Sequence, residues 1–142
     1  LGLTREYLET KGVTVLGYQT DVLPAFYTRE SAFGVDYRGD TASELAGIFN
    51  AKEAVGLRGG LLVTNPIPEQ YSMDADAISQ TIDEAVAEAG ALGVRGKDIT
   101  PYLLDKIQKM TGGASLEANI QLVYNNVALG AEVAKELCTR RA

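Results

Sequence analysis

The residues Gly59-Gly60-Leu61-Leu62-Val63-Thr64, followed by Asn65-Pro66-Ile67-Pro68, contain the clearest strand of the chain. The apolar run is short and does not alternate with polar residues. This is typical of a strand covered on both faces, as in a parallel sheet. Two prolines then end the strand sharply. This stretch predicts an α/β protein in which helices cover a parallel sheet.

Upstream of this strand, the chain contains two predicted helices and a second strand. Residues 41–44 form a capping box that starts a helix ending at Gly56. An earlier helix is predicted from an N-cap at Thr4 to Gly12, and the β-rich residues 13–18 follow it directly. A helix joined to a strand by one glycine is typical of an α/β unit.

Three helices are predicted downstream. The first covers about residues 74–90, the second starts at Thr100-Pro101, and the third is capped by Ser115. The predicted buried stripe of the last helix is Leu116, Ile120, Val123, Val127, Ala134 and Leu137. Two firm strands make a thin sheet. We therefore expect residues 1–142 to form part of one layered α/β/α domain with a mostly parallel sheet. We expect that sheet to be incomplete here and to be extended by another segment or chain.

Composition excludes several classes of function. The 13 basic and 19 acidic residues give a formal charge of −6, and no basic stripe is present, so binding to nucleic acid or an acidic membrane is not expected. There is no histidine, which excludes Ser-His-Asp and Cys-His catalysis by this chain alone. A single cysteine, Cys138, fits a reducing cytoplasm, and no apolar run is long enough for a membrane span.

Residues 19–40 are predicted to be irregular, with extended pieces at 23–27 and 35–37. Half of the ten aromatic residues lie between Tyr18 and Tyr37. Long loops of this kind are often binding loops or subunit contacts. Arg29, among these aromatics, could hold a carboxylate, a phosphate or a subunit interface, although a structural ion pair is the more common role.

Several polar positions are candidate binding residues. Thr111-Gly112-Gly113-Ala114-Ser115 is either a tight helix–helix turn, the interpretation we favour, or an anion site at a helix N-terminus. The last helix carries Asn119, Asn125 and Asn126, whose amides suit either a ligand, through a uracil edge or a sugar hydroxyl, or hydrogen bonds within the fold. For Asn125 and Asn126 we favour hydrogen bonds within the fold, whereas for Asn119 both roles stay open. Asn65-Pro66 follows a strand, where ligands bind in open α/β sheets and where rigid turns are also frequent.

Four separated motifs, in order, resemble one known family. They are Tyr18-Gln19-Thr20 with Leu23-Pro24-Ala25-Phe26-Tyr27, the Gly59–Gln70 stretch, Gly96-Lys97 with Thr100-Pro101-Tyr102-Leu103-Leu104, and Thr111–Asn126. Together they are similar to the pseudouridine-5′-phosphate glycosidases, also called indigoidine-synthase-A-like proteins. The resemblance covers essentially the whole chain and indicates the C-terminal half of such an enzyme.

This resemblance implies cleavage of the C–C glycosidic bond of pseudouridine 5′-phosphate into uracil and ribose 5-phosphate, reversibly. In the family a lysine forms a Schiff base with the opened ribose, a glutamate acts as acid and base, and Mn²⁺ is bound nearby. Family members are typically homotrimers. A C-glycoside lacks a good leaving oxygen, so an imine electron sink is chemically reasonable.

The family's lysine, glutamate, metal ligand and phosphate-binding residues match no position in this chain. They lie upstream of the region that it resembles. Only Asn119 carries over, at the position of an asparagine that contacts the substrate, and Lys11 and Lys97 receive no catalytic role. We therefore expect no catalytic residue and no metal ligand here, an inactive isolated chain, and a need for the N-terminal half of the enzyme.

Two other functions remain open. One is a related C-glycosynthase that joins ribose 5-phosphate to an aromatic acceptor, using the same scaffold with a different base pocket. The other is a non-catalytic binding or assembly module.

Overall fold

The computed structural model describes residues 1–139 and contains a three-stranded parallel sheet. Its strands are β1 (Thr14–Tyr18), β2 (Tyr37–Gly39) and β3 (Leu61–Thr64), in the order β2-β1-β3. Leu16 of β1 lies opposite Tyr37 on one side and Val63 on the other. The α/β class and the parallel sheet predicted from the sequence are confirmed.

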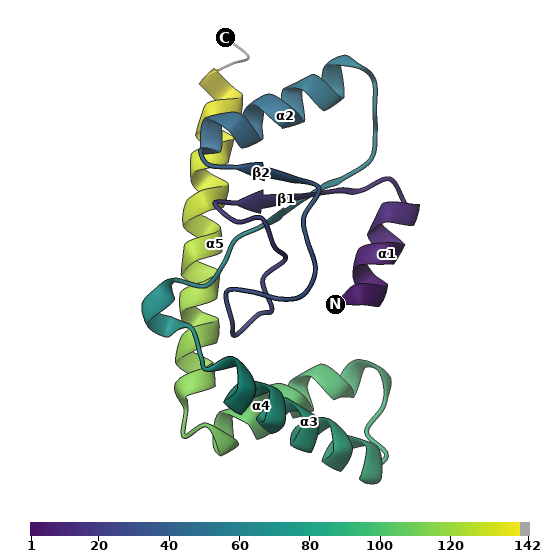
Figure 1. Ribbon diagram of the computed structural model, residues 1–142, viewed down its shortest axis with the longest axis vertical. Coiled ribbons are helices and arrows are strands. Elements are labelled where there is room, and N and C mark those ends of the chain that lie inside the picture. The colour runs from purple at the N-terminus through teal and green to yellow at the C-terminus, as the bar shows by residue number, and fades with distance from the viewer. Residues whose placement is uncertain (140–142) are drawn as a thin grey trace.

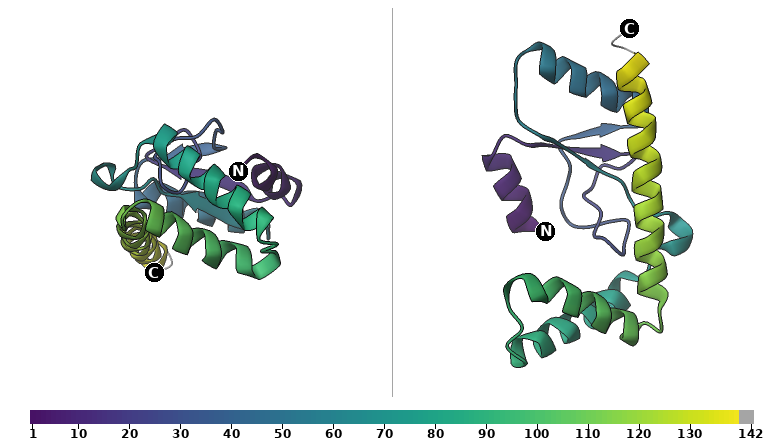
Figure 2. Two further views of the ribbon diagram at one scale, coloured as in Figure 1. Left: turned by 90° about the horizontal axis from the view of Figure 1, so that it is seen from below. Right: turned by 180° about the vertical axis from the view of Figure 1, so that it is seen from behind.

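Five α-helices and two short 3₁₀ helices accompany the sheet in the described part of the chain. They are α1 (Gly2–Thr10), α2 (Ala42–Ala54), η1 (Glu69–Tyr71), α3 (Ala75–Ala91), η2 (Gly96–Asp98), α4 (Ile99–Met110) and α5 (Ala114–Thr139). Helix α5 runs along the length of the molecule, with α3 and α4 near its start and α2 near its end (Figures 1 and 2). Its 26 residues connect the helical end of the molecule with the end that holds the sheet.

The apolar core has two parts, one at each end of α5. Near the sheet, Leu16, Leu45 and Leu129 are buried together, so α2 and α5 meet over the same face of the sheet. Near the helical end, the buried cluster contains Tyr27, Ile67, Ile78, Ala85, Ile107, Ala118 and Leu122. The position of α5 is therefore fixed at both ends by buried side chains.

Helix α2 begins as the sequence predicts. The Thr41 side chain accepts a hydrogen bond from the Glu44 amide at 3.1 Å, and the Glu44 carboxylate accepts one from the Thr41 amide at 3.1 Å. This reciprocal pair is the predicted capping box. Asp74 caps α3 in a similar way, by accepting from the Ala77 amide at 2.9 Å.

Three predicted helix starts were wrong. Helix α1 begins at Gly2, before the predicted cap Thr4, and α4 begins at Ile99, so Thr100 already lies in its first turn. At α5, Thr111 provides the cap, because its Oγ1 accepts from the Ser115 amide at 3.2 Å. Each error is a shift of a few residues, and the N-cap positions of α1 and α4, Leu1 and Asp98, make no side-chain capping hydrogen bond that a sequence motif could have signalled.

The predicted buried stripe of α5 was also largely wrong. The buried residues are Ser115, Ala118, Leu122 and Leu129. The exposed fractions of Leu116, Ile120, Val123 and Val127 range from 38% to 65%. Helix α5 is apolar on two sides, and the elements of the described chain cover only one of them.

The segment between β1 and β2 is a folded-back loop rather than an extended one. Isolated bridges join Val22 to Gly34 and Ala25 to Thr28. Phe26 has a positive φ of 57°, which turns the chain within the predicted extended piece 23–27. This turn places the Tyr27 side chain in the buried cluster near the helical end of the molecule.

Within residues 1–139, no helix combines the length and the apolar character that crossing a bilayer requires.

Candidate functional site

Asn119 lines a cavity of about 190 Å³ at the junction of α4, α5 and the loop that follows β1. The residue is partly buried. The other lining residues are Tyr27, Leu104, Asp105, Gln108, Ser115 and Leu116. The cavity therefore presents two amides, a phenol, a hydroxyl and the Asp105 carboxylate beside two leucines, which suits a small polar ring more than an anionic group such as a phosphate.

Tyr27 supplies the aromatic ring in the lining of this cavity, and its exposed fraction is 4%. Burial raises the pKa of its phenol above the ordinary value, and a hydrogen bond from Ser115 opposes part of that rise. The phenol therefore stays protonated at neutral pH and acts as a neutral hydrogen-bonding group.

A short polar chain fixes this side of the cavity. Ser115 Oγ lies 3.0 Å from Thr111 Oγ1, and the Thr111 hydroxyl donates to the Ile107 carbonyl at 2.8 Å. These contacts connect the end of α4 with the start of α5. They hold Ser115, which faces Tyr27, in a defined position.

The start of α5 is a tight turn between helices, as the favoured interpretation of the sequence predicted. Its amides are already bonded: Ala114 donates to Thr111, and Leu116 donates to Gly113. The Ser115 amide donates to the Thr111 side chain. Because these N–H groups have internal acceptors, the alternative of an anion bound at this N-terminus is not supported.

A second polar region lies at the carboxyl ends of β1 and β3. Two cavities of about 310 Å³ and 190 Å³ share Gln19, Arg29 and Pro66 in their lining. Asn125 of α5 donates from its side chain to the Pro66 carbonyl at 3.0 Å. Asn125 thus has the structural role that we favoured from the sequence, and it ties α5 to the turn after β3.

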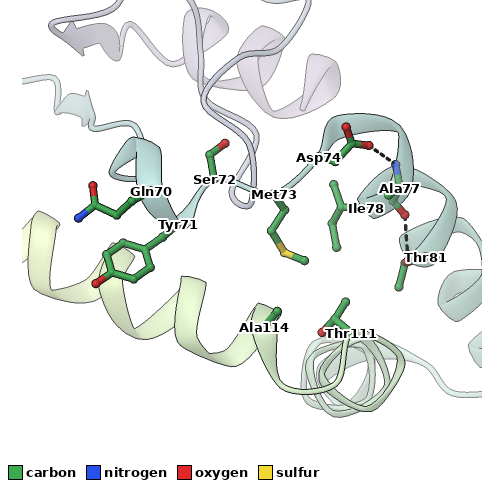
Figure 3. A pocket seen from close by; sticks show the side chains of 10 residues that line it. All are labelled: Gln70, Tyr71, Ser72, Met73, Asp74, Ala77, Ile78, Thr81, Thr111 and Ala114. Atoms are coloured by element: carbon green, nitrogen blue, oxygen red, sulfur yellow. Dashed lines mark hydrogen bonds between the residues drawn. The ribbon is translucent and has the colours of Figure 1, made fainter.

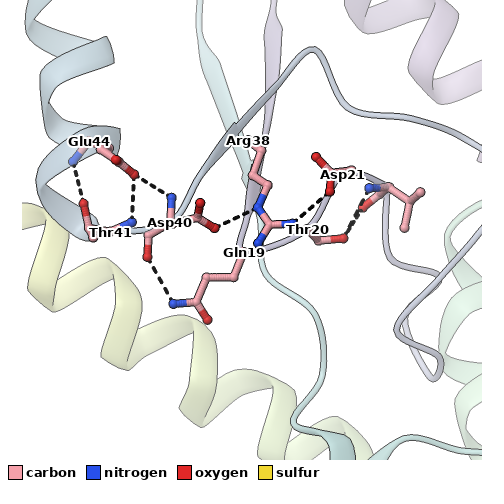
Figure 4. Close-up of polar contacts among 8 residues, drawn as sticks. Gln19, Thr20, Asp21, Arg38, Asp40, Thr41 and Glu44 are labelled. Carbon is pink, nitrogen blue, oxygen red and sulfur yellow. Dashed lines mark hydrogen bonds and ion pairs between the residues drawn. The ribbon is translucent and has the colours of Figure 1, made fainter.

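Ion pairs organise one wall of this region (Figure 4). Arg38 donates to Asp40 at 2.7 Å and to Asp21 at 2.8 Å, and both carboxylates raise the pKa of the guanidinium. Gln19 has a positive φ of 55° and donates from its side chain to the Asp40 carbonyl at 3.1 Å. A non-glycine residue in this conformation is uncommon and often marks a constrained site.

Arg29 is exposed and donates to the Ile67 carbonyl. Unlike Arg38, it forms no ion pair with a carboxylate of residues 1–139. The structural ion pair expected as its more common role is therefore wrong for this part of the chain. Its guanidinium is held by a backbone carbonyl and borders both cavities of this region.

A larger cavity, of about 390 Å³, lies between η1, the first turns of α3 and the start of α5 (Figure 3). Met73 and Ile78 give it an apolar floor, and its one carboxylate, Asp74, is engaged as the cap of α3. This cavity offers space and apolar surface, but the Asp74 carboxylate already accepts a hydrogen bond from the Ala77 amide.

The remaining candidates lie elsewhere. Cys138 is exposed near the end of α5, Lys97 lies in η2, and Lys11 follows α1, with its ammonium 5.5 Å from the Tyr7 ring centre. Asn126 is exposed and lines a separate groove beside β3. Among residues 1–139, no three acidic or sulfur-bearing side chains gather as metal ligands would, so the described residues do not fit an Mn²⁺ site.

Sequence reasoning missed Tyr27 and Gln19 as site residues. Their only signal was their place in the Tyr18–Tyr27 motif, because burial of Tyr27 and the positive φ of Gln19 depend on how the loop folds back.

Comparison with known proteins agrees with these features. The family model described as "Indigoidine synthase A like protein" matches residues 1–136. The chain is 59% identical over 137 residues to a pseudouridine-5′-phosphate glycosidase of Clostridium botulinum (strain Langeland / NCTC 10281 / Type F). It is 57% identical over 136 residues to the protein of that name from Escherichia coli (strain K12). Both matches cover 96% of this chain, which spans about half the length of these relatives, 45% and 44% respectively.

Two solved structures share the fold. The prealnumycin C-glycosynthase AlnA, in complex with ribulose 5-phosphate, has a TM-score of 0.80 and 34% identity, over 99% of this chain and 47% of its own. An indigoidine synthase A-like protein from Thermotoga maritima MSB8 has a TM-score of 0.81 and 35% identity, over 92% of this chain and 43% of its own. The four sequence motifs, the parallel sheet and these matches together show that the chain belongs to the indigoidine synthase A-like family.

Proposed function

We propose that this chain forms one half of a pseudouridine-5′-phosphate glycosidase, which splits the C–C glycosidic bond of its substrate into uracil and ribose 5-phosphate. The main support is the identity of 52–59% to proteins that carry that name. The cavity at Asn119 adds a physical reason, because its neutral amide and phenol match the alternating donors and acceptors of a uracil edge.

The division of chemistry follows from the residues present. Cleaving a C–C bond to C1′ of the sugar needs an electron sink, which a lysine imine supplies. We assign that lysine, the acid–base glutamate and the phosphate contacts to the half of the enzyme that this chain does not span. Asn119 then holds the base, and Tyr27 excludes water from that side of the ring.

A chimera tests this proposal. Residues 1–142 would replace the matching segment of the E. coli relative, which is 57% identical, and release of uracil from pseudouridine 5′-phosphate would be measured. We expect turnover within about tenfold of the parent enzyme, since the fold is shared. A chimera with native circular dichroism and thermal unfolding but no uracil release would contradict the proposal.

The alternative within the same family is C-glycoside synthesis on an aromatic acceptor. It is favoured by one observation, the likeness to the C-glycosynthase AlnA at 34% identity. Incubating the chimera with ribose 5-phosphate and either uracil or a polycyclic acceptor separates the two, because the glycosidase uses only the first. A non-catalytic binding or assembly module is the third candidate, and it predicts no product with either acceptor.

The proposal includes three further properties that rest on the family resemblance. The complete enzyme binds Mn²⁺ through residues outside this chain, assembles as a homotrimer, and acts in the cytoplasm. Metal analysis and sedimentation of the chimera test the first two, and fractionation of the source cells tests the third.

A further inference from the structure

The loop between β1 and β2 contains a two-residue hairpin turn with an aromatic residue at a position where glycine is preferred. The Ala25 amide donates to the Thr28 carbonyl at 3.1 Å, and the Thr28 amide donates to the Ala25 carbonyl at 3.3 Å. Phe26 and Tyr27 are the two central residues, and of these only Phe26 has a positive φ, of 57°. A type II′ turn has this pattern, and its first central residue is usually glycine because other side chains are strained there.

Packing in the core does not explain why Phe26 adopts this conformation. The exposed fraction of Phe26 is 48%, and the residue belongs to neither buried cluster. Its ring meets the Tyr27 ring edge to face, with the ring centres 4.6 Å apart, and this contact offsets part of the strain. Bulky residues with a positive φ are uncommon and are concentrated at functional sites. The combination of strain and exposure therefore indicates a role for the exposed surface of the ring.

The exposed ring lies next to the candidate substrate cavity. Tyr27, which the Phe26 ring contacts, lines the cavity that contains Asn119. The turn is also fixed in place, because the Tyr27 carbonyl accepts a hydrogen bond from the Met73 amide at 2.9 Å. Phe26 is thus held in a defined position, one aromatic ring away from the lining of the cavity.

The size and chemistry of this cavity leave a role for such a ring. Its volume of about 190 Å³ is below the roughly 300–1,000 Å³ of pockets that enclose a whole drug-sized ligand. Asn119 can bond the polar edge of a base there, but a side-chain amide does not cover the planar face of that base. In proteins that bind single-stranded nucleic acids, aromatic side chains cover the faces of the bases.

We propose that Phe26 is the residue on which the base of the substrate stacks while Asn119 bonds its edge. The inference rests on the proposed function, which supplies the uracil ring, and it adds a contact that depends on the planar face of the base. Because the turn already holds the Phe26 ring exposed, the ring needs no rearrangement to receive the base, which favours binding.

The test separates the face of the base from its edge. Dihydrouracil keeps the carbonyl and N–H groups of uracil but lacks the planar C5–C6 double bond, so it can bond Asn119 but stacks poorly on an aromatic ring. Isothermal titration calorimetry measures the binding of both compounds to the chimera with the E. coli relative, and kcat/KM for pseudouridine 5′-phosphate is measured separately.

Four variants of the chimera are compared with the unsubstituted form. Phe26→Leu removes the aromatic face, Phe26→Tyr keeps it, and Asn119→Ala removes the amide. Phe33→Leu is the matched control, because Phe33 lies in the same loop with an exposed fraction of 38% and without a positive φ.

We expect the unsubstituted chimera to bind uracil at least about fivefold more tightly than dihydrouracil, and Phe26→Leu to weaken the binding of uracil by at least about fivefold. The same variant should change the affinity for dihydrouracil by less than about twofold, since little stacking is lost. Phe26→Tyr and Phe33→Leu should keep the affinity for uracil, whereas Asn119→Ala should weaken the binding of both compounds. The values of kcat/KM should follow the affinities for uracil.

Equal losses for uracil and dihydrouracil in Phe26→Leu would overturn the inference, because Phe26 would then only support the fold. Unchanged affinity for uracil would also overturn it. So would a change in the sedimentation coefficient of this variant, which would place the Phe26 ring against another chain. Phe26→Gly is a second variant that suits the positive φ, so it should keep the native circular dichroism and show the same selective loss for uracil.

The proposed function and this inference fail in different ways. Phe26-dependent binding of uracil by a chimera that releases none from pseudouridine 5′-phosphate would reject only the proposed function. Release of uracil that does not depend on Phe26 would reject only the stacking role. A folded chimera that neither binds uracil nor releases it would overturn both.

Discussion

At the residue scale, Asn119 is the position where the family resemblance and the geometry can be tested together. A neutral amide that bonds the base contributes a modest free energy, on the order of 1 kcal/mol per hydrogen bond. In the chimera, Asn119→Ala should therefore lower kcat/KM for pseudouridine 5′-phosphate by about fivefold, mainly through KM. Asn50→Ala is the matched control, because Asn50 is also partly buried but lies on α2 and lines none of these cavities. Unchanged steady-state kinetics in Asn119→Ala would remove this residue from the substrate site.

The burial of Tyr27 predicts how the free energy of unfolding depends on pH. Its folded pKa is raised by burial, above an unfolded value near 10.0. Below that pH both states hold the proton and the buried phenol contributes fully to stability. As the pH rises past 10, the unfolded chain loses the proton first, so the free energy of unfolding falls.

Tyr27→Phe removes this titration. The variant should be less stable at pH 7 by about 1 kcal/mol, because the hydrogen bond between Tyr27 and Ser115 is lost, and the difference from wild type should shrink between pH 10 and 11. Urea unfolding at pH 7, 9, 10 and 11 measures this. A constant difference across the series would show that Tyr27 does not titrate differently in the two states.

At the element scale, α5 shows how much of this fold the sequence could predict. The existence and order of all five helices, the β1 and β3 strands and the parallel sheet followed from capping motifs and apolar runs. The face of α5 that is buried did not. Periodicity selected the stripe containing Val123 and Val127, which is as apolar as the side containing Leu122 and Leu129, and local spacing does not say where α2 and the sheet will lie.

The same reasoning explains which parts of the candidate site were missed. Asn119 was predicted from its motif, since its place one turn after a glycine loop is local, and its role in the site stays a prediction. The contacts of Tyr27 with Ser115 and of Asn125 with Pro66 join residues 88 and 59 positions apart, and only the tertiary fold brings them together.

The two sides of α5 make a direct test. Leu129 has an exposed fraction of 7% and belongs to the core beside the sheet, so Leu129→Ala should cost about 2–4 kcal/mol in the isolated chain. Val127, on the other side, has an exposed fraction of 65%, and Val127→Ala should change the free energy of unfolding by less than about 0.5 kcal/mol. Chemical denaturation of both variants decides the matter, and a larger loss for Val127 would mean that the helix is rotated.

At the scale of the whole molecule, the proposed function predicts that the described chain contributes binding residues and that the amine nucleophile comes from the other half of the enzyme. An imine-forming lysine must be unprotonated and sheltered from water. Lys52, Lys106 and Lys109 are held in ion pairs, with Glu53 at 2.8 Å, Glu88 at 2.6 Å and Asp105 at 2.6 Å. The other lysines, Lys11, Lys97 and Lys135, are exposed.

Sodium borohydride reduces an imine to a stable amine, so it tests for the nucleophile without requiring turnover. Mixed with ribose 5-phosphate and borohydride, the isolated 142-residue chain should gain no mass from a reduced sugar adduct. The full-length E. coli relative, treated in the same way, should gain one adduct, because the proposed mechanism places its lysine in the half that this chain does not span. Peptide mapping by mass spectrometry identifies any modified lysine in both samples.

A stoichiometric adduct on one lysine of the isolated chain would mean that this half carries its own amine nucleophile. The assignment of the lysine to the other half would then be wrong. Scattered adducts below a few per cent at the exposed lysines are the background that any protein amine gives with an open-chain sugar. The decisive quantity is therefore occupancy at a single site, compared between the two samples.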